Sequence, residues 1–587
     1  MQMAEDHRVV GRVVDHIVGY LAATGVEFIF GVDGANIEDL YDAAHFHDGV
    51  TAILAKHEFS AATMADGYSR SGAGLGVVAA TSGGGCLNTV AGLGEALASR
   101  VPVLALIGQP PMPLDGRGAF QDTSGRNGAL DGEALFSAVS VFCRRVTAAE
   151  DIVTALPAAI AAAKRGGPAV LLLPKDVQQS AFVAAGSVNG HSNGLPIVTH
   201  LGDPQVVARA LRAADGPITI IAGEQVARDD ARAELAQLRS MLRARVATVP
   251  DAKDVAGTPG LGSSSALGVT GVMGHPGVAQ AIADSALCLL VGTRLNVTAR
   301  AGLDDALALV PTYSIGAAEP FVPCTHVRTD DLRGSLKLLT QALNGDCRPT
   351  RVRVPDVVPK SELTPPRHHG PGVRYRDAMA VLDAGLPDGV DIVVDAGNIG
   401  ASAIHYLPVR RDGRFVVALG MGGMGYSFGA SLGIAFGRAM SAHAKSRGPS
   451  RRTVVLAGDG SFFMHGMEIH TAVQYGLPVT FLLFDNHAHA MCVTREQLFY
   501  NDAYSYNRFG PSRLGAGLAA MFPGLSSVDV DAIDDLPAAL RAALEVDGPS
   551  VIAVECSADE IPPFAAFLNK KNPVIAEESS SHVVARA

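Results

Sequence analysis

Short apolar runs that alternate with Ala-rich stretches recur along nearly the whole chain, and this rhythm limits its fold more than any other feature. Fully apolar runs of this length are typical of strands buried on both faces, as in parallel sheets covered by helices. The clearest runs are residues 28–32, 76–81, 102–108, 169–174, 218–223, 287–293, 391–397, 453–460 and 479–485. The pattern predicts an α/β protein.

A chain of 587 residues is too long for one hydrophobic core. Two polar stretches that carry Gly and Pro, residues 183–203 and 346–372, interrupt the rhythm and are predicted to be linkers. We therefore expect three doubly wound parallel-sheet domains, at residues 1–182, 200–345 and 370–570. The tail after Lys571 is expected to be mobile.

The composition favours a small-molecule partner in a reducing compartment. The formal charge of −11 includes no basic block, which argues against nucleic acid or a membrane surface as the main partner. Seven cysteines without metal-binding spacing favour neither a disulfide framework nor zinc. The start of the chain lacks the apolar core of a secretory signal, so we expect a cytoplasmic protein.

The longest uncharged span lies between Arg414 and Arg438 and resembles a membrane helix in length. It holds seven glycines, each of which weakens a helix by about 1 kcal/mol. We expect a turn over a ligand followed by a helix.

The segment "TVVLAGDG" is predicted to be a strand that ends in a Gly-Asp-Gly bend, with a helix starting near Ser461 or Phe462. Such a helix start can hold phosphate oxygens through free backbone N–H groups. Gly458 and Gly460 would let the backbone approach an anion, and Asp459 offers a carboxylate to a hard cation. Gly-Asp-Gly alone is also a common turn.

The predicted helix 462–475 leads to a second strand, which ends at Asp485 and Asn486. Because neighbouring parallel strands end at the same edge of a sheet, Asp459 and Asn486 are expected to meet there. With a backbone carbonyl just beyond Asn486, they would supply oxygen ligands to Mg²⁺, and the metal would bind a diphosphate.

This strand–turn–helix–strand unit, with Asp459 and Asn486 27 positions apart, resembles the diphosphate motif of thiamine-diphosphate-dependent enzymes. The resemblance extends over residues 8–565 and, within that superfamily, is greatest to the acetohydroxyacid (acetolactate) synthase large-subunit group. The stretches that carry it, in the expected order, are 30–43, 56–70, 81–97, 118–122, 173–177, 419–435 and 490–500.

The resemblance implies an N-terminal pyrimidine-binding domain, a central domain and a C-terminal diphosphate-binding domain that hold thiamine diphosphate and Mg²⁺. It makes Asp459, Asn486 and the carbonyl of Ala488 the metal ligands. The other residues that it places at the cofactor are Glu58, Gly422, Met424, Gly458, Gly460, Ser461 and Met491.

Taken alone, Glu58 is a favourable charge at a helix N-terminus, and Met424 is a gap-filling core residue. The resemblance implies that Glu58 hydrogen-bonds N1′ of the aminopyrimidine, which lets the 4′-imine deprotonate C2 of the thiazolium. Met424 would hold the cofactor in a V shape that brings these atoms together. In this family Glu58 and Asp459 come from different chains, so a homodimer or homotetramer is expected.

The chain departs from the synthases at several positions near the reacting carbon. Ala35 and Asn36 stand where the family has glycine and alanine, which makes that loop bulkier. Arg495 replaces a tryptophan that favours the second 2-oxoacid, beside Cys492. Arg495 is either a solvated surface residue or a fork for a carboxylate or phosphate of an unusual acceptor.

Gln121 and the pair of histidines around the metal loop, His487 and His489, could also hydrogen-bond reactants. Gln121, beside Phe120, is a candidate catalytic residue. For His487 and His489 we favour a structural role, because neither matches a catalytic position of the family.

The central domain gives mixed signals for FAD. Segments 268–277 and 292–300 are similar to FAD-binding segments of the synthases, but the charged pair after "GTR" is missing and "SIGAAEPF" (314–321) matches poorly. FAD is therefore a possible cofactor.

The predicted activity is decarboxylation of a 2-oxoacid such as pyruvate and transfer of the acyl carbanion to an acceptor carbonyl. Rivals within the superfamily are simple decarboxylation, flavin-dependent pyruvate oxidation and cleavage of a 2-hydroxyacyl-CoA. A non-catalytic paralogue and a nicotinamide oxidoreductase are rivals from other classes, but Glu58 is retained and no GxGxxG follows a strand of the central domain.

Overall fold

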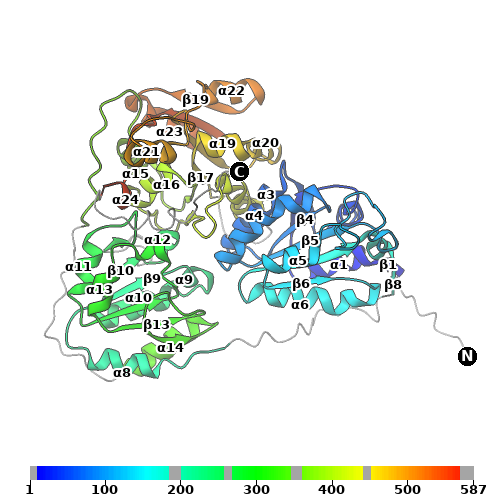
Figure 1. The fold of residues 1–587 in the computed structure, drawn as a ribbon, viewed down its shortest axis with the longest axis horizontal. Helices are drawn as coiled ribbons and strands as arrows, with labels where there is room; N and C mark the ends of the chain where they lie inside the picture. The colour runs from blue at the N-terminus through cyan, green and yellow to red at the C-terminus, as the bar shows by residue number, and fades with distance from the viewer. Residues whose placement is uncertain (1–9, 184–199, 257–266, 345–359, 441–450, 569–587) are drawn as a thin grey trace, which may run out of the picture.

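The computed structural model describes residues 10–183, 200–256, 267–344, 360–440 and 451–568. Three six-stranded parallel sheets, each flanked by helices, follow one another along the chain (Figure 1). The α/β class with three doubly wound sheets is thus confirmed. The domain boundaries stay predictions, because much of both predicted linkers and the tail after Lys571 lie outside the described residues.

The first sheet has the strand order β3-β2-β4-β5-β7-β6. Its strands are β2 (Phe28–Val32), β3 (Thr51–Leu54), β4 (Gly76–Ala80), β5 (Val103–Gln109), β6 (Phe142–Arg145) and β7 (Pro168–Pro174). The helices of this part of the chain are α1 (Val13–Ala23), α2 (Glu38–His45), α3 (Glu58–Arg70), α4 (Gly84–Ala98), α5 (Gly132–Ala138), α6 (Ile152–Lys164) and α7 (Lys175–Gln179). A separate antiparallel pair joins β1 (Val10–Arg12) and β8 (Ala181–Val183).

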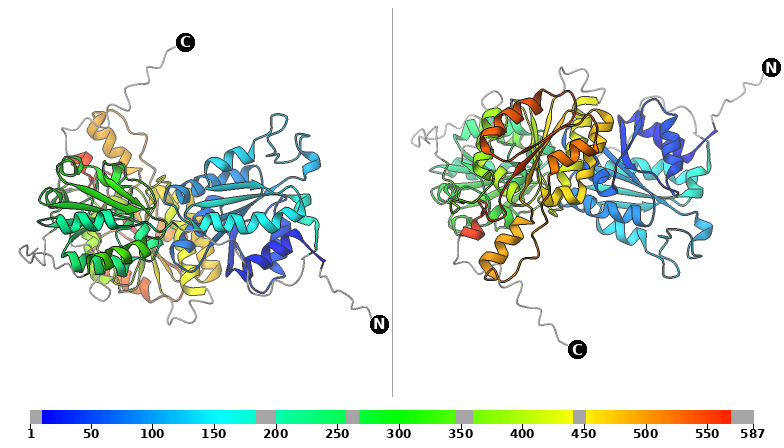
Figure 2. Two further views of the ribbon diagram at one scale, coloured as in Figure 1. Left: turned by 90° about the horizontal axis from the view of Figure 1, so that it is seen from below. Right: turned by 90° about the horizontal axis from the view of Figure 1, so that it is seen from above.

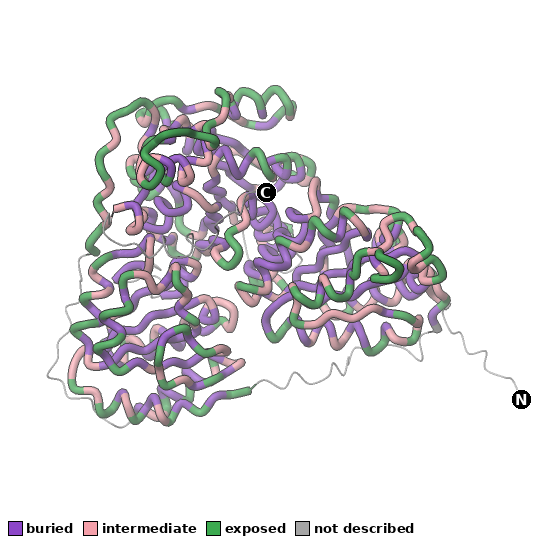
Figure 3. Tube along the Cα trace, viewed as in Figure 1, coloured by how far each residue is buried: buried purple, intermediate pink, exposed green. Residues whose placement is uncertain are grey.

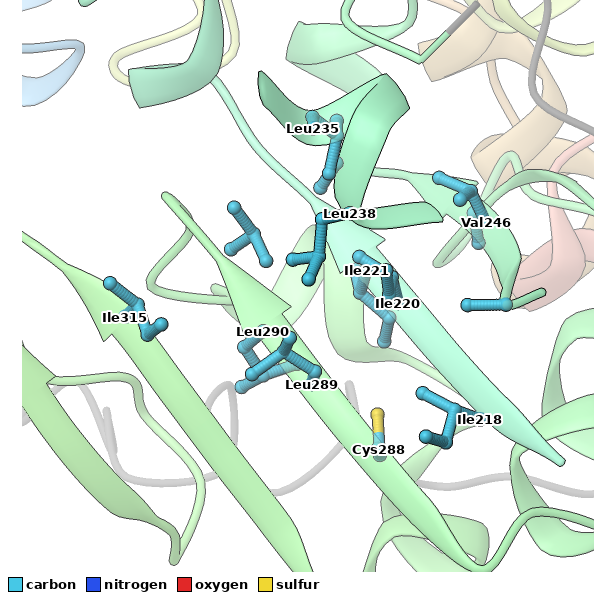
Figure 4. Packing of buried hydrophobic residues seen from close by; sticks show 14 of the residues in the cluster. Ile218, Ile220, Ile221, Leu235, Leu238, Val246, Cys288, Leu289, Leu290 and Ile315 are labelled. Carbon is cyan, nitrogen blue, oxygen red and sulfur yellow. The ribbon is translucent and has the colours of Figure 1, made fainter. Parts of the chain in front are cut away.

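The second sheet has the order β11-β10-β9-β12-β13-β14, in which the direction of winding reverses between β9 and β12. Its strands are β9 (Ile218–Ala222), β10 (Arg245–Thr248), β11 (Gly268–Val269), β12 (Leu287–Val291), β13 (Thr312–Gly316) and β14 (Thr325–Arg328). Its helices are α8 (Gln205–Ala213), α9 (Gln225–Arg228), α10 (Arg232–Leu242), α11 (Gly277–Ala283), α12 (Val297–Arg300), α13 (Asp304–Leu309) and α14 (Leu332–Leu343). Aliphatic side chains of β9 and β12 meet those of α10 in the core (Figure 4).

The third sheet has the order β16-β15-β17-β18-β20-β19. Its strands are β15 (Asp391–Val394), β16 (Phe415–Val417), β17 (Thr453–Gly458), β18 (Val479–Asp485), β19 (Ser526–Val530) and β20 (Ser550–Glu555). Its helices are α15 (Tyr375–Gly385), α16 (Asn398–Tyr406), α17 (Tyr426–Ala435), α19 (Asp459–His465), α20 (Ile469–Tyr475), α21 (Ala490–Phe499), α22 (Leu514–Met521), α23 (Leu536–Glu545) and α24 (Ala565–Leu568).

The predicted helix after the Gly-Asp-Gly bend is wrong in its start and in its continuity. It begins at Asp459 rather than near Ser461, and the stretch to Tyr475 is broken into α19, a 3₁₀ turn at Gly466–Glu468 and α20. The ring of Phe462 lies against the backbone of Gly466, where a Cβ would stand 2.1 Å from the ring. This close contact accompanies the break in the helix.

The first and third parts of the chain are joined by close packing of α3 on α17. Glycines bring the two helices together: a Cβ on Gly433 would stand 1.9 Å from the carbonyl oxygen of Met64, and one on Gly67 2.1 Å from that of Ala430. Figure 2 shows the first domain on one side of the molecule and the other two on the opposite side. The buried segments in Figure 3 include the strands of all three sheets and the α3–α17 contact.

The glycine-rich span forms β16, an irregular loop and α17, as the sequence predicts. Among the described residues, no helix is both long and apolar enough to cross a lipid bilayer. The six described cysteines are unbridged, in keeping with a reducing compartment, and a cytoplasmic location stays a prediction.

Candidate active site

The Gly-Asp-Gly bend and the end of the next strand meet at one edge of the third sheet. β17 and β18 are neighbours in register, with Gly458 opposite Phe484. The residues that follow are therefore adjacent, and Asp459 and Asn486 are 1% and 8% exposed. The backbone N–H of Ala488 donates to Asp459 Oδ2 at 3.1 Å, so the metal loop closes onto the bend.

Two side-chain oxygens at this edge are buried without a hydrogen-bond partner among the described residues: Asp459 Oδ1 and Asn486 Oδ1. Asn486 is oriented by its amide nitrogen, which donates to the hydroxyl of Tyr375 at 2.7 Å. A buried polar atom without a partner costs about 1–3 kcal/mol. Carboxylate and amide oxygens are the ligands that Mg²⁺ prefers, so this pair fits a hard cation.

Two further residues lie at the same point. One ligand atom from each of Asp459, Asp485 and His487 lies within 4.8 Å of the others. Burial, then the nearby charge of Asp485, raises the pKa of Asp459 to about 7. The electrostatics therefore also favour a cation beside these carboxylates.

The two histidines of this loop lie in different surroundings. His487 lies with Nδ1 3.1 Å from Asp485 and Nε2 3.1 Å from Glu555. The ring of His487 thus bridges two acids, and its structural role stays a prediction. His489 packs on the ring of Phe509 with centroids 4.8 Å apart.

Asp395, which the sequence analysis did not single out, organises the cofactor loop. It follows β15 at the same sheet edge and accepts hydrogen bonds from the backbone N–H groups of Gly425 and Ser427 at 3.0 Å and from the hydroxyl of Ser461 at 2.7 Å. It thus ties the loop that carries Met424 to α19. The sequence did carry a signal, because Asp395 is a third acid after a buried strand.

Met424 and Gly460 face each other across the bend. A Cβ on Gly460 would stand 3.3 Å from Met424 Cε and 2.6 Å from His489 Nδ1, so only glycine leaves room there. Gly422 is exposed with φ +66°, and its N–H, like those of Gly420 and Met421, points to Glu95 of the first domain.

Glu58 is the first residue of α3, and its contacts lie within the first domain. Its Oε2 accepts from Asn88 at 2.9 Å, and its Oε1 stands 3.2 Å from the Cβ position of Gly85. The residues before it are anchored by Glu468 of the third domain, which accepts from the backbone N–H groups of Lys56 at 2.7 Å and His57 at 3.1 Å. Glu468 was not predicted from the sequence.

Three family models match the chain in the order of its three sheets. The N-terminal TPP-binding domain of thiamine pyrophosphate enzymes matches residues 11–128, the central domain residues 205–312 and the C-terminal TPP-binding domain residues 395–554. The chain belongs to the thiamine pyrophosphate enzymes. It is therefore an enzyme that uses thiamine diphosphate, a synonym of thiamine pyrophosphate, to form or cleave carbon–carbon bonds.

Curated relatives of this thiamine pyrophosphate enzyme include acetolactate synthases. It is 28% identical to the acetolactate synthase isozyme 2 large subunit of Escherichia coli (strain K12), over 93% of this chain and 95% of that protein. It is 27% identical to a probable acetolactate synthase large subunit of Methanocaldococcus jannaschii, over 96% and 95%. The resemblance to the acetolactate synthase group is thus confirmed.

Solved structures share the fold at lower identity. A putative thiamin diphosphate-dependent enzyme from Mycobacterium smegmatis has a TM-score of 0.72 at 22% identity, over 93% of this chain and 99% of that one. Benzoylformate decarboxylase from Polynucleobacter necessarius has a TM-score of 0.75 at 20% identity, over 94% and 100%.

Two of the substrate candidates of this thiamine pyrophosphate enzyme, Asn36 and Gln121, share hydrogen bonds with the buried hydroxyls of Thr81 and Ser82. The amide nitrogen of Asn36 donates to the hydroxyl of Ser82 at 2.7 Å, and its backbone N–H donates to Thr81 at 3.2 Å. Gln121, with φ +60°, accepts from Thr81 at 3.3 Å and Ser82 at 3.5 Å through Oε1. Because Oε1 serves as the acceptor, the Gln121 amide N–H groups are available for a reactant. Ala35 is exposed.

The other substrate candidates lie on exposed or half-buried surface. Phe120 is 74% exposed. Met491 and Cys492 are half-buried on α21, while Arg495 is exposed on that helix with its guanidinium 5.8 Å from the ring of Phe567. The roles of all these residues stay predictions.

FAD stays a possible cofactor of the central domain. In doubly wound sheets a dinucleotide normally binds where the winding reverses, here between β9 and β12. The buried side chain of Gln225 lies just after β9. Its Oε1 accepts from Ala317 N–H at 2.8 Å and its Nε2 donates to the Thr329 carbonyl at 3.1 Å. Cβ positions on Gly292 and Gly316 would stand 2.9 and 3.3 Å from Gln225 atoms.

Proposed function

We propose that this enzyme is a carboligase that decarboxylates a pyruvate-like 2-oxoacid and joins the remaining acyl unit to an acceptor carbonyl. One observation carries the cofactor site of this proposal. Asp459 Oδ1 and Asn486 Oδ1 are buried at the sheet edge with no hydrogen-bond partner among the described residues. The similarity to acetolactate synthases over most of the chain supports the reaction class.

In this proposal Asp459, Asn486 and the carbonyl of Ala488 bind Mg²⁺, which holds the diphosphate beside Gly458, Gly460 and Ser461. When bound, thiamine diphosphate supplies a nucleophilic carbon and an acceptor for the electron pair that carbon dioxide leaves behind.

The protein's part is positioning and proton transfer. Glu58 holds a proton at N1′ of the pyrimidine, with Asn88 fixing its carboxylate and Glu468 fixing the start of α3. Met424 would pack against the bound cofactor. Asp395 holds the loop of Met424 against α19 through its hydrogen bonds to Gly425 and Ser461. Gln121 offers its amide N–H groups to the oxygen of the reactant.

We further propose that two copies of the chain complete each site. Glu58 contacts its own domain, and exposed apolar side chains cover the α4 side of the first domain and the α19 side of the third. These side chains are Leu87, Met421, Phe463, Met464 and Met467, which are 42–63% exposed. Exposed large apolar side chains at this place favour a protein–protein interface.

Complementation tests the shared site. Glu58→Gln and Asp459→Asn chains, each inactive alone, are co-expressed with different tags and the mixed dimer is purified. One of its two sites then has both wild-type halves, so about half of the wild-type activity per dimer should return. A mixed dimer that stays inactive would contradict a site built from two chains.

Product analysis tests the reaction. Purified enzyme is incubated with thiamine diphosphate, Mg²⁺ and pyruvate alone, then with a panel of 2-oxoacids and aldehydes, and the products are identified by mass spectrometry. Acetolactate or acetoin supports ligation. Acetaldehyde, acetyl phosphate or the absence of any product favours a decarboxylase, an oxidase or another donor.

A further inference from the structure

A cavity of about 170 Å³ lies where the central domain meets the third domain, away from the cluster of Asp459 and Asn486. We call it the interdomain pocket. It lies between the ends of β10 and β11 and the C-terminal end of α16, with Lys360 and Glu362 on one side. Figure 1 shows β10 and α16 in the two domains that meet here. The residues that line it and carry the argument are Thr248, Lys253, His275, Lys360, Glu362 and His405.

The wall of the pocket presents hydrogen-bond donors. The hydroxyl of Thr248 is buried and has no partner among the described residues. His275 accepts the backbone N–H of Val269 at Nδ1, 3.0 Å away. Burial, followed by the charges and dipoles of His405, Lys360 and Lys253, lowers the pKa of His275 to about 3. Its ring is therefore neutral with the proton on Nε2, which makes that nitrogen a donor.

His405 holds His275 in place without competing for a ligand. The two rings stack with centroids 4.6 Å apart. His405 Nδ1 lies 3.0 Å from the carbonyl oxygen of Met273, and its Nε2 accepts from the N–H of Leu363 at 3.1 Å. Both ring nitrogens are thus occupied by the protein.

Two lysine amines line the pocket, and burial lowers the pKa of both. Lys253 is 7% exposed and donates to the carbonyl oxygens of Ala403, at 3.0 Å, and Leu407 at the end of α16. Burial, then the charge of Lys360, lowers its pKa well below the usual value. Lys360 stands exposed at the mouth. The acid on the wall, Glu362, pairs with Arg376 at 2.7 Å.

The pocket holds two lysine amines, two neutral donors and an acid that is already paired with Arg376, and its lining offers no free carboxylate to a protonated lysine. Buried charges and donors are costly unless they are paired, and multidentate N–H and O–H donation is the chemistry that recognises oxyanions. The cavity has room for a small anion and not for a nucleotide. We propose that the interdomain pocket binds a small oxyanion, either inorganic phosphate or a short carboxylate.

A bound anion would link the central and third domains at a helix that leads to the cofactor loop. The pocket contacts the C-terminal end of α16, and the N-terminal end of that helix follows Asp395, which orders the loop of Met424. An anion held by Thr248 and His275 on one side and by the α16 side on the other adds contacts across the domain boundary. A ligand that binds only the folded protein raises the free energy of unfolding, and the rise grows with ligand concentration relative to Kd.

Calorimetric titration of the protein saturated with thiamine diphosphate and Mg²⁺ tests the proposal, because the cofactor then blocks the diphosphate site. Inorganic phosphate is one titrant and sodium acetate the other, at an ionic strength held constant with chloride. We expect saturable binding of at least one probe, with a rise in melting temperature. The probe that binds distinguishes a phosphate source from a carboxylate source.

Variants assign the site. Thr248→Val removes a donor without changing shape, and Lys360→Gln removes the charge at the mouth; each should weaken binding by about tenfold or more. Lys164→Gln removes an exposed charge on α6 and should bind like the wild type. No saturable binding of either probe, or equal binding by Thr248→Val and the wild type, would overturn the proposal.

Discussion

At the residue scale, the site combines groups that are unfavourable for the fold by themselves. Asp459 is buried beside Asp485 with its pKa raised to about 7, chiefly by burial. Both Asp459 and Asn486 keep a buried oxygen that no other described residue hydrogen-bonds. Functional sites commonly hold such unfavourable groups, which a bound cation relieves.

The first prediction follows from this cost. In Asp459→Asn the repulsion with Asp485 disappears, so the cofactor-free protein should melt at a temperature equal to or above that of the wild type. The rise in melting temperature with thiamine diphosphate and Mg²⁺ should disappear, and cofactor affinity should fall by about 100-fold or more. Differential scanning fluorimetry and calorimetry measure both. Asp531→Asn, an exposed carboxylate, is the control, and an unchanged cofactor response in Asp459→Asn would contradict the metal role.

Glu58 gives a second prediction at this scale. Glu58→Gln should lower turnover by orders of magnitude, because the amide cannot hold the proton at N1′, while thiamine diphosphate still binds. Steady-state rates and calorimetry separate the two. Glu133→Gln also removes an acid from the first turn of a helix of the first domain and should keep full activity. If Glu58→Gln turned over at the wild-type rate, Glu58 would be no more than a helix-terminal charge.

At the scale of elements, the contact of α3 with α17 joins the cofactor loop to the first domain. Three glycines of these helices, Gly67, Gly429 and Gly433, face backbone of the opposite helix at distances that exclude a Cβ. The contact also holds Asp66, whose Oδ1 accepts from Arg70 at 2.7 Å and from the hydroxyl of Tyr426. Both ends of this contact lead to predicted cofactor residues, Glu58 at the start of α3 and Met424 before α17.

Gly433→Ala tests this contact. The added methyl group would stand 1.9 Å from the carbonyl oxygen of Met64, so the helices must separate, at a cost of about 1–3 kcal/mol. We expect a lower melting temperature and faster proteolysis, with reduced activity. Gly517→Ala, on α22 with nothing within 4 Å of its Cβ position, should be neutral or stabilising. Equal melting temperatures for the two variants would show that the helices pack more loosely.

At the scale of the whole molecule, charges from different domains face each other where the domains meet. Asp251 of the central domain has a pKa raised to about 6, first by burial and then by Glu224, with smaller effects from Arg70 and Glu95 of the first domain. A carboxyl group whose pKa is higher in the folded than in the unfolded state is destabilising when ionised.

The sign of the pH dependence follows. Well below pH 3.8 Asp251 is protonated in both states; as the pH rises from about 4 to about 6 its contribution becomes unfavourable and stays so above. Asp251→Asn should therefore raise the melting temperature at pH 7.5 and leave it nearly unchanged at about pH 3. Melting curves across this range measure the difference between variant and wild type. A difference that is the same at both pH values would show that the gain does not come from ionisation.

The sequence by itself determined the α/β class, the nine strands named from apolar runs and the family, because buried strands and the Gly-Asp-Gly bend leave local patterns. It also predicted that Asp459 and Asn486 share a sheet edge, since parallel strands end together. It missed Asp395 and Glu468, which act through partners 30 or more positions away. It also missed the break between α19 and α20, where Phe462 packs against Gly466.

Only the tertiary structure decided which polar atoms lack partners. Three features depend on distances between elements that are far apart in the chain. They are the oxygens of Asp459 and Asn486 without a hydrogen-bond partner among the described residues, the contacts of the Gln225 side chain, and the donors of the interdomain pocket. Periodicity reports which face of a strand or helix is buried. Whether a buried polar group is satisfied depends on what the rest of the fold brings to it.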